Sequence, residues 1–340
     1  MGEVTKLESL SPHGWALTIA SQRRGLIEWN TDSVGALYHC ADCGLCRANC
    51  VTDQPLPNAI VAARNQVVES GLAPRPLYTL ADALAHWGNP YAEQMPVQPT
   101  GAGEVALFVG DEAMYRWPAA LEAATRLLEI IGIKPVLVGR GRNNGYLASS
   151  LGFAAVAHDL IAATIAEVAA VGARRLLVLA PADLYAFGDL AGERLQLKLP
   201  EGVVLEAVTD VLDNALQAGQ LALRHAEQLA AWAYVDPTHS ARIGRSGDAP
   251  RRLGAALGGE PLELFWRRER AHPSGATALR FSLPHMAYLL AQARLQDAQR
   301  QGAQIVVTEA PGDLAILSEV APRLGMRVQG LYELLASQLV

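Results

Sequence analysis

Four cysteines set within eleven residues constrain this chain more than any other feature of its sequence. They are the only cysteines among 340 residues, and their spacing is C-x2-C-x2-C-x3-C. The four are Cys40, Cys43, Cys46 and Cys50. Thiolates at this spacing can wrap a cubane [4Fe–4S] cluster, and Gly44 allows the backbone to turn close to it. The spacing therefore predicts one [4Fe–4S] cluster held by these cysteines.

Two other uses of close cysteines match the pattern less well. A structural zinc site normally pairs two C-x2-C units across a spacer of about a dozen residues or more, which residues 40–50 lack. A disulfide framework is typical of secreted chains, and residues 1–6 lack the basic-then-apolar pattern of a secretory signal. A zinc site and a disulfide framework stay open as less favoured alternatives to the cluster.

The fourth cysteine departs from the simple ferredoxin pattern. In ferredoxin loops the fourth cysteine usually ligates the other cluster of a pair and is followed by proline. Here Val51 follows Cys50, and the sequence has no second motif. Either Cys50 completes the same cluster, or Cys40, Cys43 and Cys46 hold it and the fourth ligand comes from elsewhere.

The charge and hydropathy of the chain limit its partners. Its net charge is −6 and its pI is near 5.8, which argues against the basic surface that binds nucleic acid or anionic membranes. The apolar stretches at 151–157 and 162–171 fall short of the about 20 residues that a membrane span needs. We expect a cytoplasmic protein with no nucleic-acid partner and no direct membrane span.

The residues around the cysteines predict a small helical module. A helical pattern covers 16–29, before the cysteines, and another covers 60–71, where glycine ends it. A helix on each side of a cysteine loop is the plan of a helical ferredoxin-like module, assigned here to residues 1–72. Residues 73–103 contain five prolines and are expected to be a linker.

From residue 104 onward, short apolar runs alternate with helical patterns. Strands are expected at 105–110, 135–139, 176–180, 232–235, 262–265 and 305–308, and helices at 118–131, 160–171 and 281–301. Such alternation predicts parallel α/β packing. Two halves, 104–222 and 223–340, each contain a strand followed by Ala-Pro-x-Asp, at 180–183 and 310–313. This repetition suggests an internal duplication.

Several short motifs resemble one known group of iron–sulfur proteins. They are Ser-Pro-His-Gly at 11–14, the cysteines at 40–50, Gly-Asn-Pro at 88–90 and Asp-Pro-Thr-His-x-x-Arg at 236–242. The group comprises proteins related to the D-type subunit of heterodisulfide reductase, the glycolate oxidase iron–sulfur subunit and the lactate-utilisation iron–sulfur protein. The resemblance covers nearly the whole chain. It implies an N-terminal ferredoxin-like [4Fe–4S] module followed by two tandem CCG-like α/β domains with parallel sheets.

The second metal site of that group is missing from this sequence. Other residues stand where the family has cysteines: Asp111, Gly139, Ala180, Asp183, Thr238, Ser274, Ala310 and Asp313. These side chains cannot hold an iron–sulfur cluster as thiolates do. The family's first ferredoxin motif is absent as well. The sequence thus resembles a family member reduced to one cluster.

Three further polar segments have a structural and a functional interpretation. The glycine-rich loop at 139–145 is either a weak phosphate loop or a degenerate CCG loop. His239, with Asp236 and Arg242, forms either a polar ligand site at a strand end or leftover family structure. The run at 267–270 is either a solvated surface or an electrostatic docking patch. In each case the structural interpretation is favoured, and no catalytic residues are expected.

The resemblance implies an electron-transfer subunit of a larger oxidoreductase. The expected partner is a flavoprotein or reductase subunit, in a heterodisulfide-reductase-like or FAD-dependent 2-hydroxy-acid-dehydrogenase-like complex. The alternative is a non-catalytic scaffold or assembly subunit, or a redox sensor, with a structural cluster. We also expect the N-terminal module to carry the cluster unaided and the α/β halves to serve as a docking surface.

Overall fold

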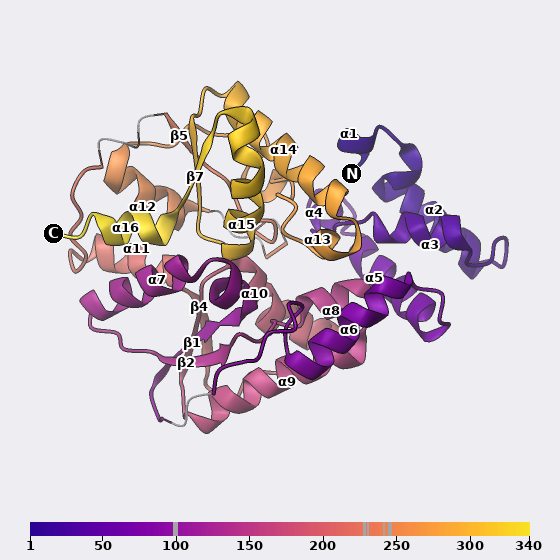
Figure 1. Ribbon diagram of the computed structural model, residues 1–340, viewed down its shortest axis with the longest axis horizontal. Coiled ribbons are helices and arrows are strands. Elements are labelled where there is room, and N and C mark those ends of the chain that lie inside the picture. Colours follow the sequence, from indigo (N-terminus) through magenta and orange to yellow (C-terminus); the bar gives the residue numbers. More distant parts are fainter. Residues whose placement is uncertain (98–100, 227–228, 230, 241, 244–246) are drawn as a thin grey trace.

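The chain folds into a group of N-terminal helices and two α/β halves that pack against one another (Figure 1). The computed structural model describes residues 1–97, 101–226, 229, 231–240, 242–243 and 247–340. In Figure 1 the N-terminal helices lie at the right beside both halves, with the second half above the first. Over these ranges, no helix is both long enough and apolar enough to cross a membrane.

The N-terminal region consists of short helices. They are α1 (Gly2–Thr5), η1 (Glu8–Leu10), α2 (Pro12–Arg23), α3 (Thr31–Tyr38), α4 (Leu45–Ala48) and α5 (Leu56–Glu69). Ser11 caps α2 through its hydroxyl, and Pro12 takes the first helical position, where an N–H is not needed. The helix expected over 16–29 is therefore wrong at both ends, since α2 begins earlier and stops before Gly25, which has a left-handed backbone. The helix expected over 60–71 is confirmed as α5, although α5 begins earlier, at Leu56.

A helix also lies where prolines suggested a linker. α6 (Arg75–Trp87) occupies 13 residues of the segment 73–103, so the expectation of a linker is wrong there. Pro74 precedes the helix and Pro76 lies in its first turn, positions at which proline starts a helix rather than breaking it. The apolar face of α6 is buried, with Leu84 fully inaccessible.

The first half contains a four-stranded parallel sheet. Its strands are β1 (Val105–Val109), β2 (Val136–Arg140), β3 (Arg175–Val178) and β4 (Val204–Ala207), in the order β2-β1-β3-β4. Its helical elements are η2 (Glu112–Arg116), α7 (Pro118–Ile130), α8 (Tyr146–Leu151), α9 (Ala154–Ala170), α10 (Pro181–Tyr185), η3 (Ala186–Arg194) and α11 (Val208–Gln217). The expected strands are confirmed as β1, β2 and β3, and the expected helices as α7 and α9. β4 was not expected, because it is a partly exposed edge strand without a continuous apolar run.

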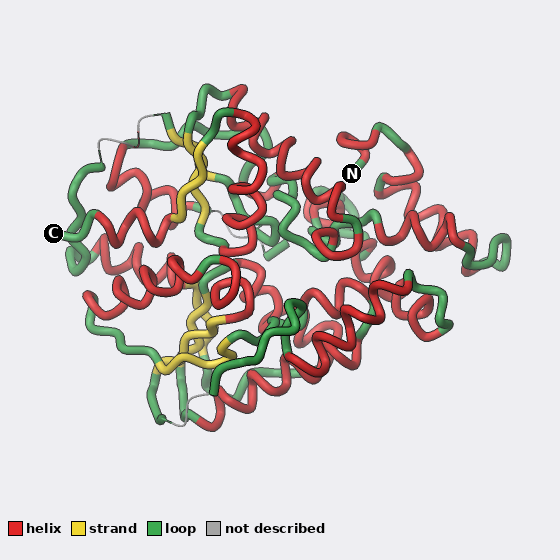
Figure 2. The backbone as a smooth tube through the Cα atoms, viewed as in Figure 1, coloured by secondary structure: helices red, strands yellow, loops and turns green. Residues whose placement is uncertain are grey.

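The second half repeats this topology with a smaller sheet. Its strands are β5 (Trp232–Tyr234), β6 (Ile305–Thr308) and β7 (Arg327–Gly330), all parallel and in that order. Its helical elements are α12 (Asp248–Gly258), η5 (Arg268–Arg270), α13 (Leu279–Ser282), α14 (Pro284–Arg300), α15 (Pro311–Val320), η6 (Ala321–Leu324) and α16 (Leu331–Ser337). The expected strands at 232–235 and 305–308 are confirmed as β5 and β6, and the helix at 281–301 as α14. Figure 2 shows the strands of both halves among their helices.

The strand expected at 262–265 is wrong. Leu262 forms a single parallel bridge with Ala233 of β5, at the place where β2 pairs with β1 in the first half. The chain then leaves the sheet, because the backbone N–H groups of Phe265 and Trp266 bind the Asp297 carboxylate at 3.3 and 3.0 Å. With this bridge counted, the two sheets have the same strand order.

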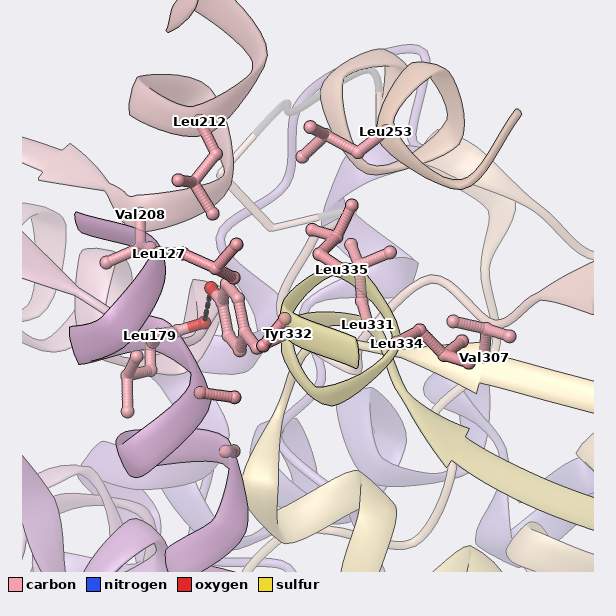
Figure 3. Packing of buried hydrophobic residues seen from close by; sticks show 14 of the residues in the cluster. Leu127, Leu179, Val208, Leu212, Leu253, Val307, Leu331, Tyr332, Leu334 and Leu335 are labelled. Atoms are coloured by element: carbon pink, nitrogen blue, oxygen red, sulfur yellow. Dashed lines mark hydrogen bonds between the residues drawn. The ribbon is translucent and has the colours of Figure 1, made fainter. Parts of the chain in front are cut away.

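One hydrophobic core belongs to both halves. Leu127 and Leu212 from the first half pack in the same cluster as Leu253 and Leu335 from the second (Figure 3). Tyr332 of α16 ties the halves together, since its hydroxyl donates a 2.8 Å hydrogen bond to the backbone carbonyl that follows β3. The halves are therefore not independent in their packing.

The shared core predicts that the halves unfold together. Leu335→Ala should lower the free energy of unfolding by roughly 2–5 kcal/mol, because Leu335 is fully buried between the halves. The exposed Leu26 supplies the control, and Leu26→Ala should change stability by less than about 0.5 kcal/mol. Urea denaturation followed by circular dichroism measures both. Two separate transitions, with only one of them shifted by Leu335→Ala, would contradict a shared core.

Candidate metal centre and interdomain cavity

The cysteine loop lies where the N-terminal helices meet the α/β halves. Cys40, Cys43 and Cys46 line one cavity of about 860 Å³. Residues of α1 and α14, and of the segment 266–273, form much of the remaining wall. A cavity of this volume is in the range that binds cofactors. Three of the four predicted ligands are thus brought together.

Cys50 lies apart from this cavity. Its Sγ is 3.3 Å from the Thr52 hydroxyl and accepts a 3.5 Å hydrogen bond from the Gln54 backbone N–H. These hydrogen bonds lower the pKa of the Cys50 thiol. The fourth predicted ligand therefore sits on the outer side of the loop.

The cavity cysteines are desolvated, and backbone N–H groups point at their sulfurs. Burial raises the pKa of Cys40 to about 11 and that of Cys46 to about 12, and it raises the pKa of Cys43 as well. The Asp42 N–H donates to the Cys40 Sγ at 3.3 Å, and Leu45 gives Cys43 a similar bond. Hydrogen bonds of this kind stabilise metal-bound thiolates.

The three cysteines share one cavity wall but do not form a closed set of metal ligands. Within the described ranges, no group of three or more histidine, cysteine, aspartate or glutamate side chains is placed to hold a metal ion. Zinc, whose ligands surround one ion, and a cubane cluster, whose thiolates bind separate irons, both stay alternatives for these cysteines.

Asp42 anchors the cysteine loop to the rest of the protein. Its side chain is 1% exposed and receives Arg242 from the second half at 2.7 Å and Arg194 from the first half at 3.3 Å. Burial alone would raise its pKa, but the two guanidinium groups outweigh burial and hold the pKa of Asp42 at about 2. A Cβ at Gly44 would lie 2.8 Å from the Arg242 Nε, and Gly44 has a φ of +78°. Gly44 is thus required by the approach of Arg242 as well as by the turn.

A third arginine holds the start of the loop. Arg64 of α5 is 1% exposed, and its guanidinium donates to the carbonyl oxygens of Cys40 at 2.7 Å and Leu37 at 2.5 Å. It also binds the Ser150 carbonyl at 2.6 Å. Arg64 belongs to none of the sequence motifs, and its only signal in the sequence is its place within an otherwise apolar helix face.

The cavity wall also carries buried positive charge. Arg294 is 1% exposed, and its Nη1 donates to the Trp266 carbonyl at 2.8 Å and pairs with Asp297 at 3.2 Å. Its Nε and Nη2 have no hydrogen-bond partner among the described residues. Further cations line the cavity: Lys6, Arg270 and Arg300. Buried donors without acceptors are costly, so Arg294 fits a negatively charged occupant such as a thiolate-ligated cluster, and the exposed cations at the rim add to its positive field.

A second cavity lies between the two halves, where the resemblance places a second metal site. Its volume is about 90 Å³, and it is lined by segments that follow β1, β3, β5 and β6. Asp111 and Asp183 line it from the first half, and Asp313 from the second. Thr238 and Ser274 both bind Asp313. Three aspartates that are far apart in the sequence thus line one cavity.

The structure separates the three polar residues around His239, for which the sequence favours the structural interpretation. Asp236 forms an ion pair with Arg251 at 2.8 Å, and Arg242 turns to Asp42. His239 instead lines the interdomain cavity, and its ring lies against aromatic side chains. The three residues do not share one site, although they are close in sequence.

Two of the polar segments noted in the sequence form ion pairs with other parts of the chain. In the loop 139–145, the first N–H donates to Glu167 at 2.8 Å, and Arg142 pairs with the same carboxylate at 2.6 Å. Glu167 thus stands where a phosphate loop would hold its anion. Arg268, within the run at 267–270, pairs with Asp248.

Comparisons with known proteins bear on the fold alone. No protein-family model matches the chain, and no curated protein matches it. Among solved structures, it is similar to the crystal structure of a hypothetical protein from Helicobacter pylori, with a TM-score of 0.64 and 12% identity. The match covers 96% of this chain and 67% of that chain. At this identity the similarity supports the mixed α/β fold, and function must be argued from the residues.

The Asp42 ion pairs predict a strong dependence of folding on one carboxylate. Asp42→Asn should lower the free energy of unfolding by roughly 3–5 kcal/mol, since it leaves Arg194 and Arg242 buried without their anion. Asp53→Asn is the matched control in the same loop, because Asp53 is exposed and its ion pair is solvated. Urea denaturation compares the variants. Equal losses from both would show that Asp42 does not hold the loop.

Proposed function

We propose that this chain is an electron-transfer subunit of a larger oxidoreductase and holds one [4Fe–4S] cluster in the cavity of its cysteine loop. The observation that carries this proposal is the convergence of Cys40, Cys43 and Cys46 on one cavity of cofactor size. A cluster bound there would accept and release single electrons. The flavoprotein or reductase partner, and membership of the CCG-domain family, rest on the sequence resemblance.

The surroundings of the cysteines support this occupant. Backbone N–H groups directed at sulfur, and cations in the wall, stabilise the negative charge of a thiolate-ligated cluster. The buried donors of Arg294 acquire acceptors when an anionic group fills the cavity. Three arginines fix the loop from three parts of the chain, so the cysteines are preorganised.

The fourth ligand is open between Cys50 and His272. Cys50 would have to leave its partners Thr52 and Gln54 and turn inward. His272 lines the same cavity as the three cysteines, with its ring stacked on Trp266 at a centroid distance of 4.2 Å. Because His272 belongs to the cavity wall and Cys50 does not, we favour His272 as the fourth ligand.

The cluster itself is the first test. Protein purified without oxygen should contain about four irons and four sulfides per chain and show a broad thiolate-to-iron absorption band. Cys43→Ser should remove most of the iron, because a hydroxyl is a poor ligand for an iron–sulfur cluster. Metal and sulfide analysis measures this. Stoichiometric zinc without sulfide would refute the cluster.

A pair of variants tests the fourth ligand. Cys50→Ser should keep about four irons per chain, whereas His272→Ala should fall to a three-iron form or lose the cluster. Iron analysis and electron paramagnetic resonance distinguish these states. If Cys50→Ser loses iron as Cys43→Ser does while His272→Ala keeps it, Cys50 is the ligand and the loop must rearrange.

The redox test separates electron transfer from a structural role. As a relay, the purified holoprotein should be reduced reversibly by dithionite, with about one electron taken up per chain and a paramagnetic signal that disappears on reoxidation. A redox titration followed by paramagnetic resonance measures this. A cluster that stays silent or is destroyed on reduction would favour the alternative, a scaffold, assembly or sensing subunit.

A further inference from the structure

The interdomain cavity contains an unusual set of buried acidic groups that the proposed cluster does not use. Asp111, Asp183 and Asp313 are at most partly exposed to solvent and line its wall from three different strand ends. Glu112 lines it too, but an ion pair with Arg280 at 2.9 Å already neutralises this carboxylate. Within the described ranges, the three aspartates therefore face one small space without an ion pair of their own.

The three aspartates are held by neutral partners. Asn143 donates to Asp111 at 2.9 Å, and Asn144 donates to Asp183 at 2.8 Å. Asp313 accepts from Thr238 at 3.3 Å. A carboxylate offers about four acceptor sites, so each group keeps acceptor capacity after these bonds.

A separate observation points to an occupant of the cavity. His239 is 2% exposed and lines this cavity, and its Nε2 has no hydrogen-bond partner among the described residues. Burial lowers the pKa of His239 to about 3, with the nearby Arg242 acting in the same direction, so the ring is neutral. In the tautomer with its proton on Nδ1, which a donor in the cavity would favour, the ring presents a buried lone pair at Nε2. A buried acceptor of this kind requires a donor.

We propose that this cavity binds a compact organic ammonium compound, whose N–H groups donate to Asp111, Asp183, Asp313 and the Nε2 of His239. These acceptors come from several strand ends and surround the space, which suits a ligand with several N–H donors better than a single metal ion. An anion would meet a wall of carboxyl groups. Binding at the carboxyl ends of parallel strands is the usual position for ligands in α/β proteins.

The cavity volume limits the size of the ligand. A cavity of roughly 150 Å³ accommodates benzene, so the about 90 Å³ here suits about four non-hydrogen atoms. Ethylenediammonium has this size and presents an ammonium group at each end. It is the probe for the test, with the neutral ethylene glycol as its control of similar shape.

Calorimetric titration of the full-length protein tests the proposal. Ethylenediammonium should bind saturably at one site per chain, and ethylene glycol should not. Asp183→Asn and Asp313→Asn should each weaken binding about tenfold or more, because each removes a charge-assisted acceptor. Asp159→Asn, at an exposed position on α9, should leave binding unchanged. Binding unaffected by both cavity variants would place the site elsewhere and overturn the proposal.

Proton release gives a readout that needs no variant. Burial raises the pKa of Asp111 and Asp183 to about 7 and that of Asp313 to about 6. A cation favours their ionised forms, so binding at pH 6–7 should release protons and tighten as the pH rises. Glu112 also faces the cavity and forms an ion pair with Arg280, whose pKa is raised by that carboxylate in spite of burial. Tyr146 keeps its proton because burial raises its pKa, and His239 stays neutral. Titration in buffers of different ionisation enthalpy measures the release.

Three results would overturn the proposal. They are no saturable binding of ethylenediammonium, binding without proton release, and binding of Mg²⁺ or Zn²⁺ that Asp183→Asn and Asp313→Asn abolish while ethylenediammonium does not compete. The first would mean that the cavity holds only water, and the last would identify a metal site. The titration tests this cavity separately from the cluster, because the cavity variants leave the cysteine loop unchanged.

Discussion

The buried charge of Asp42 is the interaction on which the arrangement of this protein depends. One carboxylate in the cysteine loop receives an arginine from each α/β half, and removing any member would strand a charge away from water. This buried set of charges keeps one geometry, because separating its members would leave a buried charge without a partner. The expectation that the N-terminal module carries the cluster unaided stays a prediction. The α/β halves supply part of the loop's support, which gives them a role besides docking.

The two cavities are separated by a thin layer of side chains. Tyr146 lines the interdomain cavity, and its hydroxyl donates to the Asp42 carbonyl at 3.0 Å. His239 packs against Tyr146 with ring centroids 4.4 Å apart, and Arg242 lies over the Tyr185 ring at 4.5 Å. The cysteine loop and the interdomain cavity therefore share neighbours. This closeness follows from the topology, because the carboxyl ends of both parallel sheets face the junction between the halves.

Short sequence patterns predicted the strands and candidate ligands that depend mainly on neighbouring residues. Continuous apolar runs located β1, β3, β5 and β6, whose side chains are buried on both faces. The prolines around α6 led to the wrong expectation of a linker. Proline breaks the interior of a helix, but it is also common in the first turn, where α6 has it. The cysteine spacing identified the candidate ligands, and the cavity brings three of them together. Spacing could not reveal the arginines that hold the loop, since Arg64, Arg194 and Arg242 are far apart in sequence and meet only in the folded chain.

The interdomain cavity is a polar site within an otherwise apolar junction between the halves. A site with no occupant would be more stable with apolar side chains, because burying Asp111, Asp183 and Asp313 disfavours their charged forms. Asparagine, serine and threonine partners reduce that penalty without neutralising the charge. A cationic ligand would remove the rest of this desolvation penalty. It would also stabilise the folded state, and this stabilisation grows with the logarithm of the ligand concentration once that concentration exceeds the dissociation constant. Ligand binding would then offset the free-energy cost of burying the three aspartates. Such a cost at a polar cavity is typical of a binding site and not of a packed core.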